Sequence, residues 1–182
     1  MSNTTEQEVF WQGDFGDEYS DRNRGDKWVA SNAAFFSKVL YRTHGIDTVL
    51  ELGANIGLNL MAIKQLLPDA KLSAVEINER AAAELASNVP GIDLHLKSIL
   101  EFEPTMSWDL VFTKGVLIHI NPEKLPDVYK LMYECSNRYL FVSEYYNPQP
   151  VEISYRGHAG KLFKRDFAGE LLDAFPSLDL VD

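Results

Sequence analysis

The apolar and polar residues of the chain form short apolar runs that alternate with longer stretches of helical period. Apolar side chains recur at helical spacing from Trp28 to His44, and Gly45 then supplies a stop. Five short strands are predicted downstream, at Thr48–Leu52, Lys71–Ile77, Asp93–Lys97, Trp108–Thr113 and Tyr139–Ser143. Helices are predicted between them at Ile56–Leu67, Glu79–Asn88 and Pro122–Cys135. Strands that alternate with helices of about 10–15 residues indicate parallel β-α-β units. We therefore predict an α/β fold with a doubly wound, mostly parallel sheet between two helical layers.

The N-terminal segment lacks this alternation. Phe10–Arg24 mixes aromatic residues, glycine and both charge signs without a helical or strand period. No Pro- or Gly-rich linker and no internal repeat interrupts the chain. We interpret residues 1–27 as an ordered arm or lid, and residues 28–182 as the core of a single domain.

The C-terminal segment is also irregular. We expect Pro148–Lys164 to be a long loop, followed by a last helix at Phe163–Phe175 and the beginning of a strand at Leu178–Val181. Sheets of the predicted kind normally close with an antiparallel hairpin. The last antiparallel strand is therefore expected to be missing, either because the chain is truncated or because this edge of the sheet is unusual.

Composition and charge narrow the possible functions. The chain has 182 residues, is 46% hydrophobic and carries a formal net charge of -10. Such a charge disfavours binding to nucleic acid, whose phosphates attract clustered Lys and Arg, and suits a small or cationic substrate. Cys135 is the only cysteine, and no window approaches the roughly 20 apolar residues of a membrane span. We expect a cytoplasmic protein that binds no membrane; the sequence indicates no oligomeric state.

A glycine-rich turn follows the first predicted strand. Its residues are Gly53, Ala54, Asn55, Ile56 and Gly57, which with the preceding Glu51 make the pattern E-x-G-x-x-x-G. In an open parallel sheet, ligands bind beyond the carboxyl ends of the strands at the switch point, where this turn would lie. Gly53 would allow a sharp turn close to a ligand, and Gly57 would let the next helix pack nearby. We predict that the turn is the floor of a nucleoside site.

A second carboxylate supports this prediction. Glu76 ends the second predicted strand, nineteen residues after Gly57. In dinucleotide-binding folds, a carboxylate at this place accepts hydrogen bonds from the ribose hydroxyls. The adenine would then be bordered by Ile77 and Asn78 on one edge and by Ser98 and Ile99 on the other.

Two cofactors remain to be compared. For a nicotinamide dinucleotide the turn lacks the G-x-G-x-x-G order, and the carboxylate of Glu51 would repel a pyrophosphate. Glu51 suits the cationic amino-acid end of S-adenosylmethionine, directly or through water. A strand with a glycine turn also occurs in α/β proteins that bind no nucleoside. We expect S-adenosylmethionine as the cofactor, S-adenosylhomocysteine as its product, and no metal site.

Several segments carry a resemblance to known proteins. Glu51–Gly57, Val75–Asn78 and Trp108–Phe112 resemble the class I methyltransferase motifs in order and spacing. A narrower resemblance, to the pseudaminic acid biosynthesis-associated methylase family, covers nearly the whole chain and is carried by Gln7–Gly16, Tyr19, Arg22–Asn23, Phe112–Pro122, Glu144–Pro148 and Tyr155–Phe167. The resemblances imply a Rossmann-like methyltransferase fold, three-layer αβα, and an association with nonulosonic sugar biosynthesis.

The loop after the fourth strand would face both the sulfonium and the acceptor. Lys114 could contact the carboxylate of the cofactor or an acid of the substrate, or it could lie in solvent. His119 could take a proton from the acceptor, but its apolar neighbours favour a position in the core. Asn121 and Pro122 are typical of the start of a helix.

The fifth strand and the segments around the cleft supply candidates for acceptor binding. Glu144, Tyr145, Tyr146 and Asn147 place a carboxylate, two phenols and an amide at the cleft mouth, where they could hold an amine or amidine, or could be a polar strand end beneath a loop. Arg156 and Lys164 could pair with an acceptor carboxylate, or could offset nearby acids. In the arm, Trp11 and Tyr19 could close over the substrate and the cofactor, or could fix the arm to the domain.

Methyl transfer is an in-line displacement, so alignment and desolvation supply most of the acceleration, and a strong base is optional for a neutral amine. We predict N- or O-methylation of a small polar acceptor, with Glu144, Tyr145 or His119 orienting it and taking up the proton. The alternatives are methylation of another small amine, amidine or amino-acid-like metabolite, methylation of a protein side chain, a dehydrogenase, and a non-catalytic protein that binds S-adenosylmethionine.

Overall fold

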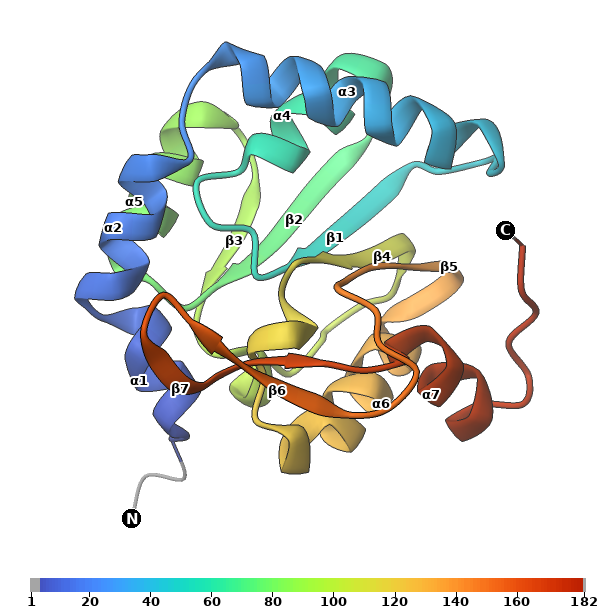
Figure 1. Ribbon diagram of the computed structural model, residues 1–182. Helices are drawn as coiled ribbons and strands as arrows, with labels where there is room; N and C mark the ends of the chain where they lie inside the picture. Colours follow the sequence, from blue (N-terminus) through green and yellow to red (C-terminus); the bar gives the residue numbers. More distant parts are fainter. Residues whose placement is uncertain (1–3, 182) are drawn as a thin grey trace.

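The computed structural model describes residues 4–181, and in this range the central sheet has five parallel strands (Figure 1). The strands are β1 (Thr48–Leu52), β2 (Lys71–Glu76), β3 (Asp93–Leu96), β4 (Trp108–Lys114) and β5 (Ser136–Ser143). Their order is β3-β2-β1-β4-β5, and each neighbouring pair is parallel. The order reverses between β1 and β4, which places the switch point at the predicted glycine turn. The predicted doubly wound, parallel sheet is confirmed.

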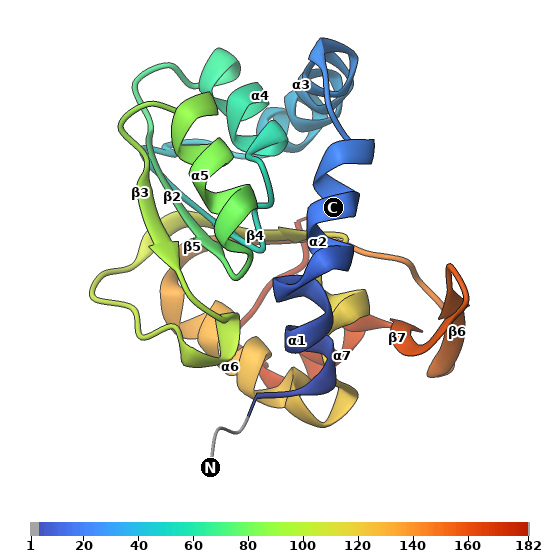
Figure 2. The same cartoon turned by 90° about the vertical axis from the view of Figure 1, so that its left-hand side faces the viewer.

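Helices cover both faces of the sheet (Figure 2). One layer contains α3 (Asp26–Tyr41), α4 (Leu58–Leu66) and α5 (Glu79–Asn88), and the other contains α6 (Leu125–Cys135) and α7 (Phe167–Ala174). Consecutive side chains of a strand point to opposite faces, so Val49 packs against the layer of α3, α4 and α5, and Leu50 packs against the layer of α6 and α7. Both faces are therefore buried, as a parallel sheet requires, and the predicted three layers are confirmed. Between residues 4 and 181, no helix has the length and apolar character needed to cross a membrane.

Short 3-10 helices follow β3 and β4. They are η1 (Ile99–Glu101), η2 (Leu117–His119) and η3 (Pro122–Lys124). Asn121 caps η3, because its side-chain oxygen accepts from the backbone N–H of Glu123 at 3.0 Å. The predicted helix from Pro122 is thus a 3-10 turn that continues into α6 at Leu125.

The N-terminal arm is helical, which its sequence pattern did not indicate. Helix α1 (Glu6–Gln12) and helix α2 (Asp14–Arg22) are separated at Gly13. Helix α1 begins with a capping box, in which Thr5 and Glu8 accept each other's backbone N–H groups. Helices this short gain most of their stability from packing on neighbours. Residues 1–3 of the predicted arm, and residue 182, lie outside the described residues.

The C-terminal predictions were partly wrong. The expected loop contains an antiparallel hairpin of β6 (Val151–Tyr155) and β7 (His158–Lys164), which forms a separate two-stranded sheet. The sequence V-E-I-S-Y of β6 alternates apolar and polar side chains, a strand signal that the prediction of a loop missed. Phe163 therefore belongs to β7, and α7 begins only at Phe167. Residues 178–181 form no strand, and no antiparallel strand joins the central sheet within the described chain.

Candidate functional site

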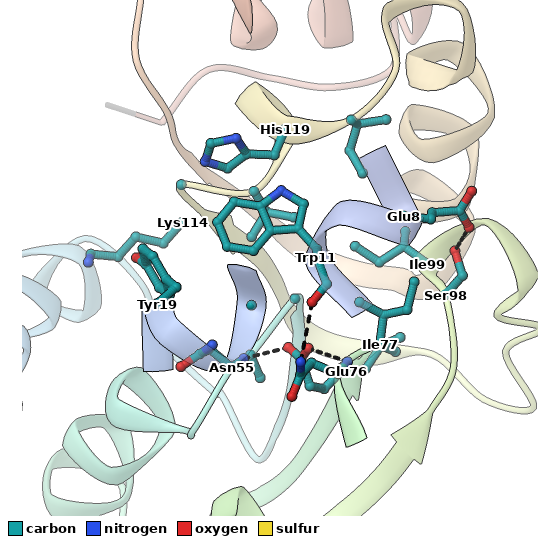
Figure 3. Close-up of a pocket in the computed structure, with 18 of the residues that line it drawn as sticks. Glu8, Trp11, Tyr19, Asn55, Glu76, Ile77, Ser98, Ile99, Lys114 and His119 are labelled. Carbon is teal, nitrogen blue, oxygen red and sulfur yellow. Dashed lines mark hydrogen bonds between the residues drawn. The ribbon is translucent and has the colours of Figure 1, made fainter. Parts of the chain in front are cut away.

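A cavity of about 220 Å³ lies between the carboxyl ends of the strands and the two N-terminal helices (Figure 3). The turns after β1, β2, β3 and β4 supply its floor, and α1 and α2 supply its roof. One water needs only about 10–15 Å³ of such space. The cavity therefore has room for a ligand of many atoms, at the edge of the sheet where this fold binds ligands.

The glycine turn brings the backbone close to this cavity. Gly53 has φ 77°, and a Cβ on it would lie 2.8 Å from the side chain of Val116 in the loop after β4. Gly57 has φ 82°, and a Cβ there would meet Leu85 of α5 at 3.0 Å. Both positions favour glycine for conformation as well as for space.

Glu76 lies at the end of β2 beneath the cavity. Its Oε2 accepts from the backbone N–H of Asn55 at 2.6 Å, and its Oε1 accepts from that of Asn78 at 2.8 Å. Burial raises the pKa of Glu76, and these backbone N–H groups oppose the shift. A carboxylate has about four acceptor positions, so further hydrogen bonds remain open to it. The group can accept from two hydroxyls of a bound ribose.

Glu51 does not itself line the cavity, but it is hydrogen-bonded to the lining residue Asn59 and is only 1% exposed. Its Oε1 accepts from Asn59 Nδ2 at 2.6 Å. Its Oε2 and the Oδ1 of Asn59 have no hydrogen-bond partner among the described residues. Burial raises the pKa of Glu51 to about 8, while Asn59 and the Lys114 ammonium act in the opposite direction. Two unpaired buried acceptors side by side fit a group with several N–H donors, such as an ammonium.

Lys114 and Tyr19 also line the cavity. The Nζ atom of Lys114 lies 5.8 Å from the ring centroid of Phe35, and its charge acts on Glu51. Lys114 is thus on the Glu51 side, where it could meet the carboxylate of an amino acid. Burial raises the pKa of Tyr19, so its phenol stays neutral and can donate a hydrogen bond.

The predicted base end of the cavity is walled by Ile77 and Ile99, with Ser98 at its far side. Ser98 Oγ donates to a carboxylate oxygen of Glu8 on α1 and accepts from the backbone N–H of Leu100 at 3.0 Å. Sequence reasoning missed Glu8 as a residue of this site. Its only signal is the capping box Thr5-x-x-Glu8, which indicates a helix and not a ligand contact.

The N-terminal arm is hydrogen-bonded to Asn55 and Asn78, the residues whose backbone N–H groups bind Glu76. The Nδ2 atom of Asn55 donates to Ser20 Oγ at 2.9 Å, and that of Asn78 donates to Asp17 Oδ1 at 2.9 Å. These two asparagines therefore hold Glu76 through their backbones and the arm through their side chains.

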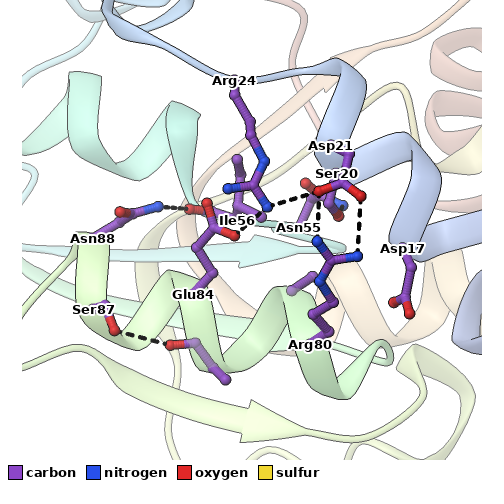
Figure 4. A network of polar contacts seen from close by, with 12 residues as sticks. Asp17, Ser20, Asp21, Arg24, Asn55, Ile56, Arg80, Glu84, Ser87 and Asn88 are labelled. Carbon is purple, nitrogen blue, oxygen red and sulfur yellow. Dashed lines mark hydrogen bonds and ion pairs between the residues drawn. The ribbon is translucent and has the colours of Figure 1, made fainter.

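An ion-pair network continues the attachment along α5 (Figure 4). Arg80 pairs with Asp21 at 2.5 Å, and Arg24 pairs with Glu84 at 2.7 Å. Arg24 also lies 3.1 Å from Asp21, so four charges link α2 and the residues just after it to α5.

His119 lines the other side of the cavity although only 8% of it is exposed. Its Nδ1 lies 2.6 Å from the carbonyl oxygen of Lys161. A carbonyl can only accept, so Nδ1 carries the proton and Nε2 keeps the free lone pair. Burial lowers the pKa of His119 to about 4. The ring is therefore neutral at pH 7 and can accept a proton at Nε2.

Two aromatic rings from distant parts of the chain pack against His119. The centroid of the Trp11 ring lies 4.5 Å from that of His119, and the Tyr155 ring lies 4.9 Å from it. Tyr19 packs edge-on against Trp11 at 5.3 Å. The Nε1 atom of Trp11 is buried and has no hydrogen-bond partner within the described chain. We call Trp11, Tyr19, His119 and Tyr155 the aromatic cluster.

Glu144 lies beneath the site and does not line the cavity. Its Oε1 accepts from the backbone N–H of Val116 at 3.0 Å, and its Oε2 accepts from that of Ile118 at 3.4 Å. Burial raises its pKa, and the backbone donors oppose the shift. Glu144 therefore fixes the loop that carries His119.

The other residues predicted for the acceptor lie outside the cavity. Tyr145 and Tyr146 are 57% and 64% exposed, and Lys164 Nζ lies 5.4 Å from the centroid of the Tyr145 ring. The Nδ2 atom of Asn147 donates to the carbonyl of Gln149 at 2.6 Å. Arg156 is exposed in the turn of the β6–β7 hairpin. The structure thus brings Trp11 and His119 together and leaves these five residues on the outer surface.

No family model and no curated protein matches this chain. Solved structures do resemble it. They include a sugar N-methyltransferase from Streptoalloteichus sp. ATCC 53650, with 16% identity, a TM-score of 0.61, and coverage of 81% of this chain and 63% of that one. An amino pentose methyltransferase from Micromonospora echinaspora, with bound S-adenosylmethionine, has 16% identity, a TM-score of 0.59, and coverage of 76% and 63%. The magnesium protoporphyrin IX methyltransferase from Synechocystis PCC 6803, also with bound S-adenosylmethionine, has 12% identity, a TM-score of 0.61, and coverage of 90% and 98%.

These identities are low, so the likeness establishes the fold alone. The chain has the Rossmann-like class I methyltransferase fold, as its motifs predicted. It spans less than two thirds of the length of the two sugar methyltransferases.

Proposed function

We propose that this chain transfers a methyl group from S-adenosylmethionine to a small polar acceptor. The observation that carries the proposal is a pair of buried carboxylates at the cavity. Glu76 lines it and has open acceptor positions, and Glu51, which is hydrogen-bonded to the lining residue Asn59, has an unpaired oxygen. Glu76 would accept from the ribose hydroxyls, Glu51 and Asn59 would accept from the ammonium, and Lys114 would pair with the carboxylate. When bound, the cofactor supplies an electrophilic methyl group on a sulfonium.

The chain's own residues would align the acceptor and remove its proton. His119 Nε2 would take the proton of the acceptor N–H or O–H, because its tautomer leaves that nitrogen free. Glu144 would position His119 through the backbone of Val116–Ile118. Trp11 and Tyr19 would exclude water, which strengthens the electrostatic interactions of the site. Tyr145, Tyr146, Asn147, Arg156 and Lys164 would then contact only parts of an acceptor that extend out of the cavity.

For the acceptor, we propose a sugar-like molecule that carries an amine or a hydroxyl. Two proteins of similar fold are described as acting on sugars, one as a sugar N-methyltransferase and one as an amino pentose methyltransferase. The resemblance to the pseudaminic acid biosynthesis-associated methylases favours a nonulosonic sugar or its nucleotide-linked form. Arg156 and Lys164 at the outer surface would suit the acid group of such a molecule.

Calorimetry would test the cofactor assignment directly. We expect S-adenosylmethionine and S-adenosylhomocysteine to bind, and NADH not to bind, because the turn lacks the G-x-G-x-x-G order of a dinucleotide site. Binding of NADH in place of the other two would refute the proposal. A labelled-methyl assay over metabolites extracted from the source cell, with mass identification of the product, would then identify the acceptor. A cofactor that binds but never transfers its methyl group would indicate a non-catalytic binding protein.

A further inference from the structure

The end of the cavity beyond Glu76 combines two apolar walls with one acidic side chain. In Figure 3, Ile77 and Ile99 lie between Glu76 and the pair of Glu8 and Ser98. If Glu76 holds the ribose, the base lies between the two isoleucines, and its far edge meets Glu8 and Ser98. A flat ring suits the apolar walls, so recognition of the base depends on the polar pair at that edge.

The hydrogen bonds that Glu8 and Ser98 already form leave the pair with free acceptor positions and no free donor. Ser98 donates its single hydroxyl proton to Glu8. The second oxygen of Glu8 accepts from the backbone N–H of Thr5 at 2.7 Å. Each oxygen of a carboxylate can accept a further hydrogen bond, whereas the hydroxyl has no second proton to donate. The edge is therefore suited to a ligand group that donates.

Glu8 is also a buried acid without a cationic partner. Only 9% of its surface is exposed, and within residues 4–181 it forms no ion pair with Lys or Arg. Its hydrogen bonds come from one backbone N–H and one hydroxyl. An additional N–H donor from a ligand would stabilise this carboxylate, since hydrogen bonds to charged groups are stronger than neutral ones.

We propose that Glu8 selects adenine by accepting a hydrogen bond from its exocyclic amino group. This inference rests on the proposed function. In hypoxanthine the amino group is replaced by a carbonyl oxygen, which the carboxylate would repel. Glu76 in the sheet thus binds the ribose, and Glu8 in the N-terminal arm recognises the base. Adenine recognition therefore requires α1 to be docked.

The experiment compares S-adenosylhomocysteine with S-inosylhomocysteine, which carries hypoxanthine, by calorimetry. Wild-type protein should prefer the adenine ligand by about tenfold or more, the factor expected for one hydrogen bond to a charged group. Glu8→Gln should reduce this preference to less than about threefold, because an amide can donate to the carbonyl as well as accept from the amine. Gln also preserves the capping box, so α1 should remain folded.

The matched control is Glu6→Gln on the same helix, whose side chain is 89% exposed. It should keep the wild-type preference. Both ligands are measured on each variant, so a partly inactive sample changes neither ratio. A wild-type ratio in Glu8→Gln, or equal affinities in the wild type, would overturn the role of Glu8 while leaving the proposed function in place. Failure of both ligands to bind the wild type would overturn both proposals.

Discussion

The cavity has two sides that are built in different ways. On the cofactor side, Glu51 is the last residue but one of β1 and Glu76 is the last of the neighbouring strand β2, and each is placed by its own β-α unit. On the acceptor side, His119 depends on the carbonyl of Lys161 in β7 and on the ring of Trp11 in α1. Local sequence therefore specifies the first side, whereas the second exists only when distant segments have come together.

Burial shifts the pKa values of the two sides in opposite directions. Burial raises the pKa of Glu51 to about 8 and lowers that of His119 to about 4. In both cases burial favours the neutral form. The cofactor side thus gains a charge when a cationic ligand arrives, whereas the acceptor side keeps a neutral base ready at pH 7.

The largest effect should come from the acceptor side. His119→Ala should lower kcat by about 100-fold or more, the usual contribution of a general base, and leave the affinity for S-adenosylhomocysteine unchanged. Turnover is measured with the acceptor identified by the labelled-methyl assay. His158→Ala, which removes a ring 5.0 Å from Phe10, is the matched control and should keep the wild-type kcat. Equal turnover of the His119 variant and the wild type would exclude the proposed role.

The cofactor side should respond in affinity. Glu76→Ala should weaken binding of S-adenosylhomocysteine by roughly 1.5–3 kcal/mol, the range for hydrogen bonds that involve a charged group. Calorimetry measures the change, and Glu79→Ala, an exposed acid three residues further on, should bind as the wild type does. If Glu76→Ala bound the ligand normally, the ribose would have to lie elsewhere.

The pH dependence of stability should distinguish the contribution of Glu51 from that of His119. The pKa of Glu51 in the folded protein lies above its usual value of 4.5, so its contribution to stability is present below about pH 4.5 and is lost as pH rises toward 8. The folded pKa of His119 lies below 6.5, so its contribution is present above about pH 6.5 and is lost as pH falls toward 4. Between pH 7 and 9, Glu51→Gln should therefore raise the Tm of the ligand-free protein relative to the wild type. Parallel melting curves from pH 5 to 9 would contradict a buried, neutral Glu51.

The smallest effect is expected at the ion pairs of the arm. Asp21→Asn removes the contacts with Arg24 and Arg80, but these side chains are largely exposed, and exposed pairs contribute little. The arm should stay docked through Asn55 and Asn78, so hydrogen exchange in α1 and α2 should remain close to that of the wild type. Asn78→Ala should increase this exchange clearly. Rapid exchange of the arm in Asp21→Asn would show instead that the charges hold it.

The sequence alone determined the parallel sheet, the glycine turn and the positions of Glu51 and Glu76. A strand, a turn and a helix are specified within about 30 residues, because apolar period and glycine spacing are local properties. The hairpin β6–β7 was not predicted although Val151–Tyr155 alternate apolar and polar side chains, because five residues are a short signal within an otherwise irregular segment.

Only the tertiary structure decided what the buried polar groups do. It turned Glu144 toward the backbone of the loop, fixed the tautomer of His119 through Lys161, and brought Glu8 to Ser98 across ninety residues of sequence. Such roles depend on which donors and acceptors meet after folding. The two partners of a hydrogen bond lie about 3 Å apart in space but can be far apart in the sequence, so the local sequence pattern does not identify them.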